Sequence, residues 1–265
     1  EFRPKAISLV LAGGLLAAII GPELAKHTLD WLAPVFYAGS YLSLVGLYLL
    51  SFCLLAFVKI PRMSAEDRRD TGRPLLEILR QPACIVAILA SAAAYSTMSL
   101  VMSPTPLAME ACGFDTDDTF TVMQAHVIGM FLPAFFTGHL VSRFGARPII
   151  LSGIAMIAVC AAVNLTGITL AHFAVALFLN GVGWNFMFVG GSSLLTEVHT
   201  PAERAKVQGI HDFTVFGTIA VSALFSGRIL EDLGWDWINI GILPMIAVAL
   251  IATLILAGSR PQRAA

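Results

Sequence analysis

The residues best suited to carry chemistry stand within an apolar stretch late in the chain, Val207–Leu230. One helical face of this stretch comprises Gln208, His211, Asp212, Val215, Thr218 and Ser222. Ionisable side chains in an apolar helix raise its free energy unless they have polar partners, so they mark candidate functional sites. Asp212 or His211 could carry a proton or gate a passage. The alternative is that both only form hydrogen bonds to neighbouring helices.

The depth of Asp212 depends on where its helix begins. Thr200, Pro201 and Glu203 match a capping box with proline at the first helical position, so the helix is predicted to begin near Pro201. Asp212 then lies roughly 16 Å further along the axis, at a rise of about 1.5 Å per residue. That distance excludes a capping role for its carboxylate in the first turn.

Two isolated ionisable residues are further candidates for proton coupling. His126 lies about one and a half turns inside an apolar stretch and could titrate near neutral pH. Glu23 directly follows Gly21 and Pro22 near the end of another apolar stretch. The alternatives are structural: a hydrogen-bonded histidine, and a carboxylate at the membrane interface.

A second group of side chains could line a cavity for a small solute. The predicted cavity residues are Tyr95, Ser99, Met102, Asn180, Trp184, Asn185 and Phe188. Trp184 would supply an aromatic wall and Asn185 a hydrogen-bonding amide, which is a combination typical of ligand pockets. The alternative is that the glycines beside Trp184 only allow close helix packing, and that the short hydroxyls only bond back to their own helix.

Long apolar stretches must position these residues. The chain of 265 residues is 57% hydrophobic and only 12% charged, about half the charged fraction of soluble domains. Eight stretches reach the roughly 20 residues that a helix needs to cross a bilayer. They are Ala6–Ala25, Val35–Val58, Ala83–Met109, Thr121–Val141, Pro148–Gly167, Phe173–Leu195, Val207–Leu230 and Trp237–Gly258. Because only helices satisfy their own backbone in lipid, an all-α polytopic membrane protein is predicted.

The basic residues predict the orientation of these helices. If successive loops alternate between the two sides of the membrane, one side collects every lysine and arginine except Lys26 and Arg228. We therefore expect that side to be cytoplasmic, with both ends of the chain on it, in the cell (inner) membrane. The opposite side carries acidic and aromatic loops at Glu110–Phe120 and Glu231–Trp237.

Composition and motifs argue against several other classes of protein. A net charge of −1 gives no reason to expect a nucleic-acid partner. The four cysteines are scattered and unpaired in sequence, and no group of residues suggests a metal, a cofactor or an enzyme. No GxxxxGK[ST] loop is present, which argues against an ATP-driven pump.

The one long connection, Lys59–Pro82, is rich in charge and divides the helices into two and six. Its end, PLLEILRQP, has Leu75, Leu76 and Leu79 at helical spacing, which predicts a short helix on the membrane surface. The alternative is an ordinary solvated linker.

The turn GHLVSRFGARP resembles the signature loop of the major facilitator superfamily, roughly G-x-L-x-D-R-x-G-R-[KR]. The matching residues are Gly138, Leu140, Arg143, Gly145 and Arg147, while Ser142 and Ala146 stand where the family has Asp and Arg. The glycines permit a tight turn and close helix contact. The resemblance implies a loop that stabilises one gating state, and Ser142 would weaken its charge network. The alternative is a plain basic turn on the cytoplasmic side.

The stretch AAIIGPELA is similar to a fifth-helix pattern of the same family, best known from its proton-driven exporters. Ala17, Gly21, Pro22 and Ala25 fit the pattern, with Ala in place of Gly at both ends. Small residues allow close packing and proline favours a kink. The alternative is a generic proline kink.

The two resemblances have the order and separation of helices five to twelve of this family. They imply that residues 1–58 are the last two helices of an N-terminal half, 59–82 the central linker and 83–265 a complete six-helix C-terminal half, with the first four helices missing. The implied function is a secondary transporter that moves a small, neutral or weakly charged solute through the bilayer by alternating access, coupled to protons, with export favoured. A membrane sensor or scaffold and an oligomeric half-transporter are the alternatives.

Overall fold

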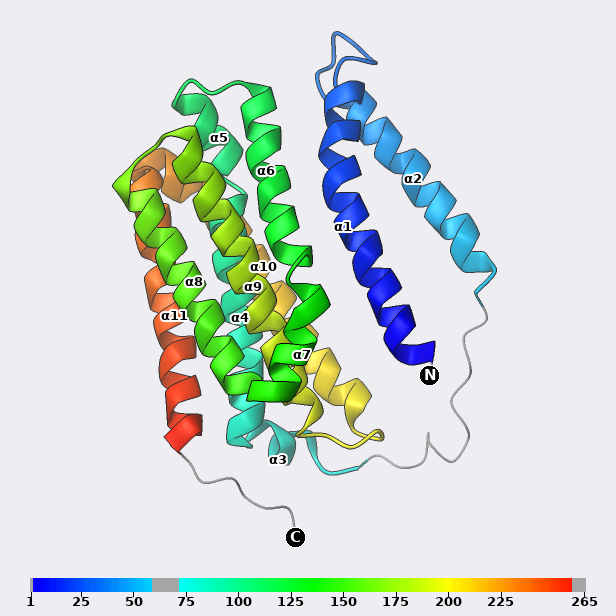
Figure 1. The fold of residues 1–265 in the computed structure, drawn as a ribbon, viewed down its shortest axis with the longest axis vertical. Helices are drawn as coiled ribbons and strands as arrows, with labels where there is room; N and C mark the ends of the chain where they lie inside the picture. Colours follow the sequence, from blue (N-terminus) through cyan, green and yellow to red (C-terminus); the bar gives the residue numbers. More distant parts are fainter. Residues whose placement is uncertain (1, 59–71, 259–265) are drawn as a thin grey trace.

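The computed structural model describes residues 2–58 and 72–258, and the regular secondary structure in these ranges is helical (Figure 1). The helices are α1 (Phe2–Thr28), α2 (Ala38–Ala56), α3 (Leu75–Leu79), α4 (Pro82–Met102), α5 (Thr105–Ala111), α6 (Thr116–Phe131), α7 (Ala134–Phe144), α8 (Ala146–Thr166), α9 (Leu170–Thr196), α10 (Arg204–Leu233) and α11 (Trp235–Gly258). The greater part of the predicted linker, residues 59–71, lies outside the described residues.

Seven helical segments in the described ranges are long and apolar enough to cross a membrane. They are Ala38–Ala56, Pro82–Ala111, Thr116–Phe144, Ala146–Thr166, Leu170–Thr196, Arg204–Leu233 and Trp235–Leu256. They match the last seven predicted stretches, which confirms the all-helical membrane fold. The first predicted stretch lies in α1, which has 27 residues but is not among the seven, so the eighth span stays a prediction.

Two of the predicted spans are each divided into two helices at a proline. Ser103 and Pro104 separate α4 from α5, and Leu132 and Pro133 separate α6 from α7. Proline has no backbone N–H, and its ring clashes with the preceding turn, so the regular helix is interrupted there. The break at Pro133 was not predicted from the sequence.

The C-terminal six spans form one bundle with α4 at its centre. Helices α9, α10 and α11 pack around α4, while α8 packs on α9 and α11, and α6 packs on α9. Glycines let α9 approach two neighbours closely. A Cβ on Gly181 would lie 2.4 Å from the carbonyl oxygen of His126 in α6, and one on Gly183 would lie 2.6 Å from Ile157 Cγ1 in α8.

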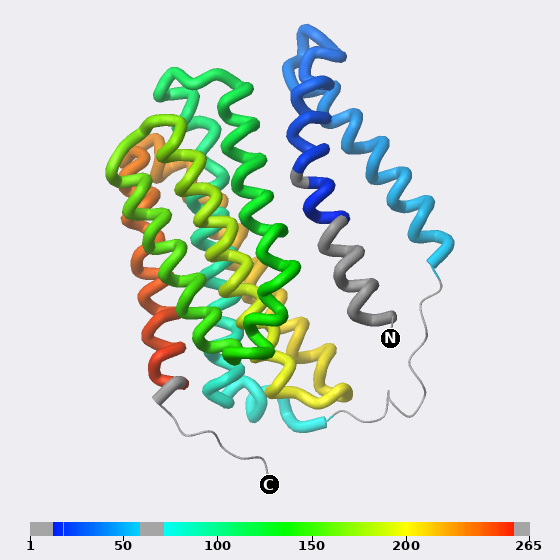
Figure 2. Tube along the Cα trace, viewed as in Figure 1, coloured from blue at the N-terminus to red at the C-terminus, as the bar shows by residue number. Residues whose placement is uncertain are grey.

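Helices α1 and α2 form a separate pair beside this bundle (Figure 1). Ser40 Oγ donates to the carbonyl oxygen of Ala25 at 2.8 Å, and Thr28 Oγ1 donates to Ser40 Oγ at 3.2 Å, which fixes the turn between the two helices. The pair meets the bundle mainly through α1 and α6. Figure 2 shows α2 running away from the bundle toward its own C-terminal end, so the two groups of helices diverge on that side.

Candidate functional site

Three of the predicted cavity residues form an aromatic cluster where α4 meets α9. Tyr95 of α4 lies edge-on to Trp184 and Phe188 of α9, with ring centroids 5.1 and 5.2 Å apart. Trp184 and Phe188 are four residues apart on one helical face, and their rings stack at 5.3 Å with an interplanar angle of 16°. Both arrangements are preferred aromatic geometries. Tyr95 and Phe188 are only half-buried, so part of the aromatic surface of the cluster is exposed.

A hydrogen-bonded group on α10 contains the three ionisable or amide residues that the sequence singled out. Gln208 Nε2 donates to Asp212 Oδ1 at 2.8 Å, and His211 Nδ1 lies 2.9 Å from the same oxygen. The His211 side chain is 2% exposed, whereas that of Asp212 is 47% exposed. His211 Nδ1 therefore donates to the carboxylate, which leaves Nε2 buried and without a partner among the described residues.

Asp212 lies on α10, which packs against α4, the helix that carries Tyr95. Tyr95 is in turn the edge-on partner of Trp184 and Phe188. The structure therefore places the predicted proton-coupling group and the aromatic part of the predicted cavity on three helices, α4 itself and two that pack against it.

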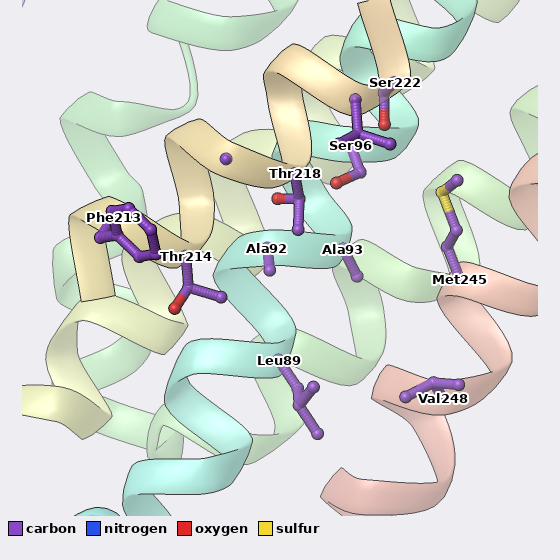
Figure 3. Close-up of a pocket in the computed structure, with 12 residues that line it drawn as sticks. Leu89, Ala92, Ala93, Ser96, Phe213, Thr214, Thr218, Ser222, Met245 and Val248 are labelled. Carbon is purple, nitrogen blue, oxygen red and sulfur yellow. The ribbon is translucent and has the colours of Figure 1, made fainter. Parts of the chain in front are cut away.

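The residues predicted to share one polar face of α10 do not all line the same groove. Thr218 and Ser222 line a groove of about 630 Å³ between α4, α10 and α11, whereas Gln208, His211 and Asp212 do not (Figure 3). The groove is lined by Leu89, Ala92, Ala93, Ser96, Phe213, Thr214, Gly217, Thr218, Val221, Ser222, Met245 and Val248. The Thr214 and Thr218 hydroxyls donate to carbonyl oxygens of their own helix. The groove therefore offers mainly apolar surface.

The two predicted cavity amides lie in different surroundings. Asn185 Oδ1 accepts from Thr137 Oγ1 at 2.7 Å, and Asn185 Nδ2 donates to the carbonyl oxygen of Met130 at 2.8 Å. These bonds tie α9 to both sides of the helix break at Pro133, where backbone carbonyls lose their usual donors, so they serve the packing of the bundle. Asn180 is fully buried, and its amide atoms have no partner among the described residues.

The remaining single candidates are spread over the bundle. Ser99 is buried in α4, and Met102 is half-buried at the end of that helix. His126 is fully buried against α9, with Nδ1 2.8 Å from the carbonyl oxygen of Leu177. Glu23 lies at the exposed end of α1, 3.6 Å from His27. In the described part of the chain, none of these four is hydrogen-bonded or ion-paired to Asp212.

The predicted signature loop forms the junction of α7 and α8. Gly145 has φ +86°, a left-handed conformation that favours glycine and permits the tight turn. Ser142 Oγ donates to the carbonyl oxygen of Gly138, so this residue is bonded within its own helix. The Arg143 guanidinium lies over the Phe144 ring, 5.3 Å from its centroid.

The two arginines of this loop lie near few charged groups in the described part of the chain. Arg147 and Glu197 both line a small pocket of about 260 Å³. Leu140, the remaining residue of the motif, is half-buried. Arg143 and Arg147 form no ion pair with the described residues. The expected effect of Ser142, in place of Asp, on a charge network in this loop stays a prediction.

The helix-five-like motif lies in the C-terminal half of α1. Pro22 is accommodated inside the helix, and the carbonyl oxygen of Ala25 accepts from Ser40 of α2. Ala17 and Gly21 are exposed, and a Cβ on Gly21 would meet no described atom within 4 Å. The close packing expected at Gly21 is therefore not made by the described residues.

Sequence reasoning missed two ion pairs between distant parts of the chain. Lys26 of α1 and Asp117 of α6 are 2.7 Å apart, and beside them Gln124 Nε2 donates to the carbonyl oxygen of Ile19 at 3.2 Å. Arg73, in the last part of the linker, lies 2.8 Å from Glu203. No local pattern marks either pair, since the partners are separated by many residues.

Glu203 also corrects the predicted start of α10. The helix begins at Arg204, three residues later than Pro201, because Pro201–Glu203 form turns instead. Half of the predicted capping box is present, since the Glu203 carboxylate accepts from the Thr200 N–H at 2.9 Å. The Arg73 guanidinium and the Thr200 N–H hold the pKa of Glu203 well below its usual range, so the carboxylate is charged at neutral pH.

Comparisons with known proteins agree with this fold. Residues 89–265 match the Major Facilitator Superfamily. The chain is 41% identical to the riboflavin transporter RfnT of Brucella anthropi over 257 residues, which is 96% of the chain and 65% of that relative. It is 27% and 24% identical to two MFS-type transporters of Bacillus subtilis, YddS and YdeG, over 90% and 94% of the chain and 58% and 62% of those relatives.

The chain thus spans 58% to 65% of the length of these three relatives. The family match covers more than half of the chain, and it includes the aromatic cluster of α4 and α9 and the hydrogen-bonded group of α10. The relatives are named as transporters, and the seven apolar helices suit a multi-pass membrane protein. The chain therefore belongs to the Major Facilitator Superfamily of membrane transporters.

Proposed function

We propose that this chain is part of a secondary transporter whose solute is a flat heteroaromatic molecule of the riboflavin type. The observation that carries the proposal is the cluster of Tyr95, Trp184 and Phe188, because aromatic side chains bind flat ring systems by stacking. The name of the RfnT relative supports the same solute class. Riboflavin has a three-ring system of this kind and no net charge, in keeping with a cavity that has few fixed charges.

The proposed architecture follows the family. Helices α1 and α2 correspond to the fifth and sixth helices of a twelve-helix transporter, residues 59–82 are its central linker, and 83–265 are its C-terminal half. Four preceding helices would then complete the cavity from the other side. The contact of α1 with α6 at one end, and the divergence of the two groups at the other, support a conformation open toward the side of the linker (Figure 1).

Asp212 is the proposed site of proton coupling in an inner-membrane protein whose termini face the cytoplasm. It is the half-exposed acid nearest to the aromatic cluster on α10, and Gln208 and His211 both bond to the same carboxylate oxygen. A proton on that oxygen would break the bond from Gln208 or reverse the one from His211. Protonation and solute binding would therefore influence each other, and the Gly21–Pro22 pattern favours export as the direction.

Riboflavin transport by the full-length protein tests the proposed solute. Membrane vesicles of both orientations are prepared from cells that express the protein. Riboflavin is supplied either inside or outside the vesicles, and the fluorescence of riboflavin inside them is followed with and without a pH gradient. Phe188→Ala should raise the KM for riboflavin roughly tenfold or more, because one stacking contact is worth about 1–3 kcal/mol. Phe216→Ala is the matched control, since Phe216 is exposed on α10 and outside the cluster.

Absence of riboflavin movement in either orientation would reject this solute. Equal KM values for Phe188→Ala and Phe216→Ala would reject the aromatic cluster as the binding surface. Asp212→Asn should lose accumulation driven by the pH gradient and keep exchange of riboflavin across the membrane. Unchanged accumulation would show that another ionisable residue carries the coupling proton, and Glu23 and His126 would be tested next.

A further inference from the structure

The loop before α10 contains a buried carboxylate with a complete set of hydrogen-bond donors. The backbone N–H and Nε of Arg73 both donate to Glu203 Oε1 at 2.8 Å, and Arg73 Nη2 donates to Oε2 at 2.8 Å. The Thr200 N–H donates to the same Oε2 at 2.9 Å. The Glu203 side chain is 1% exposed. Such a carboxylate is stable in the protein only because each oxygen is bonded and its charge is paired.

The end of the linker is shaped to fit this carboxylate. Gly72 has φ +57°, and a Cβ there would lie 2.4 Å from Glu203 Cγ, so a larger residue would displace the contact. Arg73 Nη2 also donates to the carbonyl oxygen of Val198 at 3.0 Å, and Gln81 Nε2 donates to the same oxygen at 3.3 Å. The linker end, the loop after α9 and the residue before α4 are therefore joined at one point.

The same point fixes the first turn of α10. Lys206 of that turn donates to the carbonyl oxygen of Arg73. Between Arg73 and α4, the short helix α3 packs on both α10 and α4 through the fully buried Ile78. The end of the linker was predicted to be either a helix on the membrane surface or a solvated segment. In the structure it is a short helix that packs on α4 and α10.

The orientation of α10 at this end determines where its functional group lies. Asp212 is eight residues after Arg204, or about 12 Å along the helix. A small change of direction at the start of α10 would move Asp212 relative to Tyr95 on α4. The ion pair restrains this direction, because it is charge-assisted, bonds both carboxylate oxygens and has a buried acid.

We propose that Arg73 and Glu203 are positioning residues for transport, which hold α10 so that Asp212 keeps its place relative to α4 and the aromatic cluster. The transport readout rests on the proposed function, so the test includes a second readout that needs no solute. Ser96 of α4 and Thr218 of α10 line the same groove (Figure 3), and the rate at which a bismaleimide links cysteines at these positions reports the placement of α10 against α4.

The test uses Arg73→Lys in the full-length transporter, in membranes. Lysine keeps the positive charge but lacks the planar fork that bonds both carboxylate oxygens and Val198. At equal membrane level, the maximal rate of riboflavin transport should fall about tenfold, with KM changed by less than about twofold. The rate of cross-linking between Ser96→Cys and Thr218→Cys should change severalfold. Arg204→Lys is the matched control, since Arg204 is exposed and has no ion pair with the described residues.

Three results would overturn the positioning role. One is transport by Arg73→Lys at the wild-type rate. The second is slow transport with an unchanged cross-linking rate, which would show that the ion pair acts elsewhere. The third is a loss of rate that only follows a loss of membrane level, which would show a role in folding alone. If the wild type moves no riboflavin, the proposed solute fails, and the cross-linking rates still decide the positioning role.

Discussion

Two ion pairs of similar length join distant parts of this chain in very different surroundings. Lys26 and Asp117 are 2.7 Å apart, and their side chains are 38% and 62% exposed. Arg73 and Glu203 are 2.8 Å apart, and their side chains are 40% and 1% exposed, so the difference between the pairs lies in the acid. The exposed pair connects the α1–α2 pair to the bundle, whereas the buried pair lies within the bundle and its linker. The two pairs therefore differ in which helices they allow to separate.

Burial decides what happens when such a pair opens. Lys26 and Asp117 can return to water at little cost, so their contact suits two groups of helices that part in the proposed transport cycle. Opening the Arg73–Glu203 pair would leave the buried Glu203 carboxylate without its counter-charge and the Arg73 N–H without its acceptor. We therefore expect the first contact to be made and broken in each transport cycle, and the second to persist throughout it.

The largest effect should come from removing the buried acceptor. Glu203→Ala leaves the Thr200 N–H and the Arg73 guanidinium unpaired, so the melting temperature of the detergent-purified protein should fall by at least about 5 °C. Differential scanning fluorimetry measures this fall. A melting temperature like that of the Arg204→Ala control would show that the buried pair contributes nothing to folding.

A smaller, pH-dependent effect is expected for Glu203→Gln, which cannot titrate. The pKa of Glu203 is lowered by its bonds from Arg73 and then from Thr200, against an ordinary value of 4.5. The stability that a lowered carboxylate pKa contributes is present above that ordinary value and is lost as pH falls below it. The gap in melting temperature between wild type and Glu203→Gln should therefore be constant from about pH 8 to pH 5 and narrow below about pH 4.5. A gap at pH 4 as wide as at pH 7.5 would contradict this assignment of the charge.

The smallest effect on stability is expected at the exposed pair. Lys26→Ala or Asp117→Ala should change the melting temperature by less than about 2 °C, because exposed pairs contribute little. The same variants should raise, by a fewfold, the fraction of molecules in which α1 and α6 are separated on the side of Lys26. Accessibility of a cysteine at Gln124 to a membrane-impermeant maleimide measures that population. Stability losses as large as those of Glu203→Ala would remove the distinction between the two pairs.

Much of the fold was predictable because its signals are local. Apolar runs longer than a bilayer helix gave seven of the spans, and the spacing of Trp184 and Phe188 placed two rings on one face. The breaks at Pro104 and Pro133 also have a local cause. The break at Pro133 was missed because the hydropathy of the flanking residues continues across the proline.

The parts of the site that could not be predicted depend on partners far away in sequence. Arg73 and Glu203 are 130 residues apart, and nothing near Glu203 distinguishes a cap from the acceptor of a buried ion pair. Asn185 was predicted to face a solute, yet its amide bonds to Thr137 and Met130 on another span. Helical periodicity tells which face a residue occupies, but the neighbour on that face is known only once the helices are packed.

Distances measured across both ion pairs in one protein test the central distinction most directly. Spin labels at His27 and Asp118 flank the exposed pair, labels at Leu76 and Arg204 flank the buried pair, and the native cysteines are replaced. Double electron–electron resonance is recorded for the full-length transporter in lipid nanodiscs, with and without riboflavin and at two pH values. We expect the distance between positions 27 and 118 to become longer in part of the population, while the distance between positions 76 and 204 keeps one narrow distribution. A shift between positions 76 and 204, or a fixed distance between positions 27 and 118 under every condition, would contradict this account.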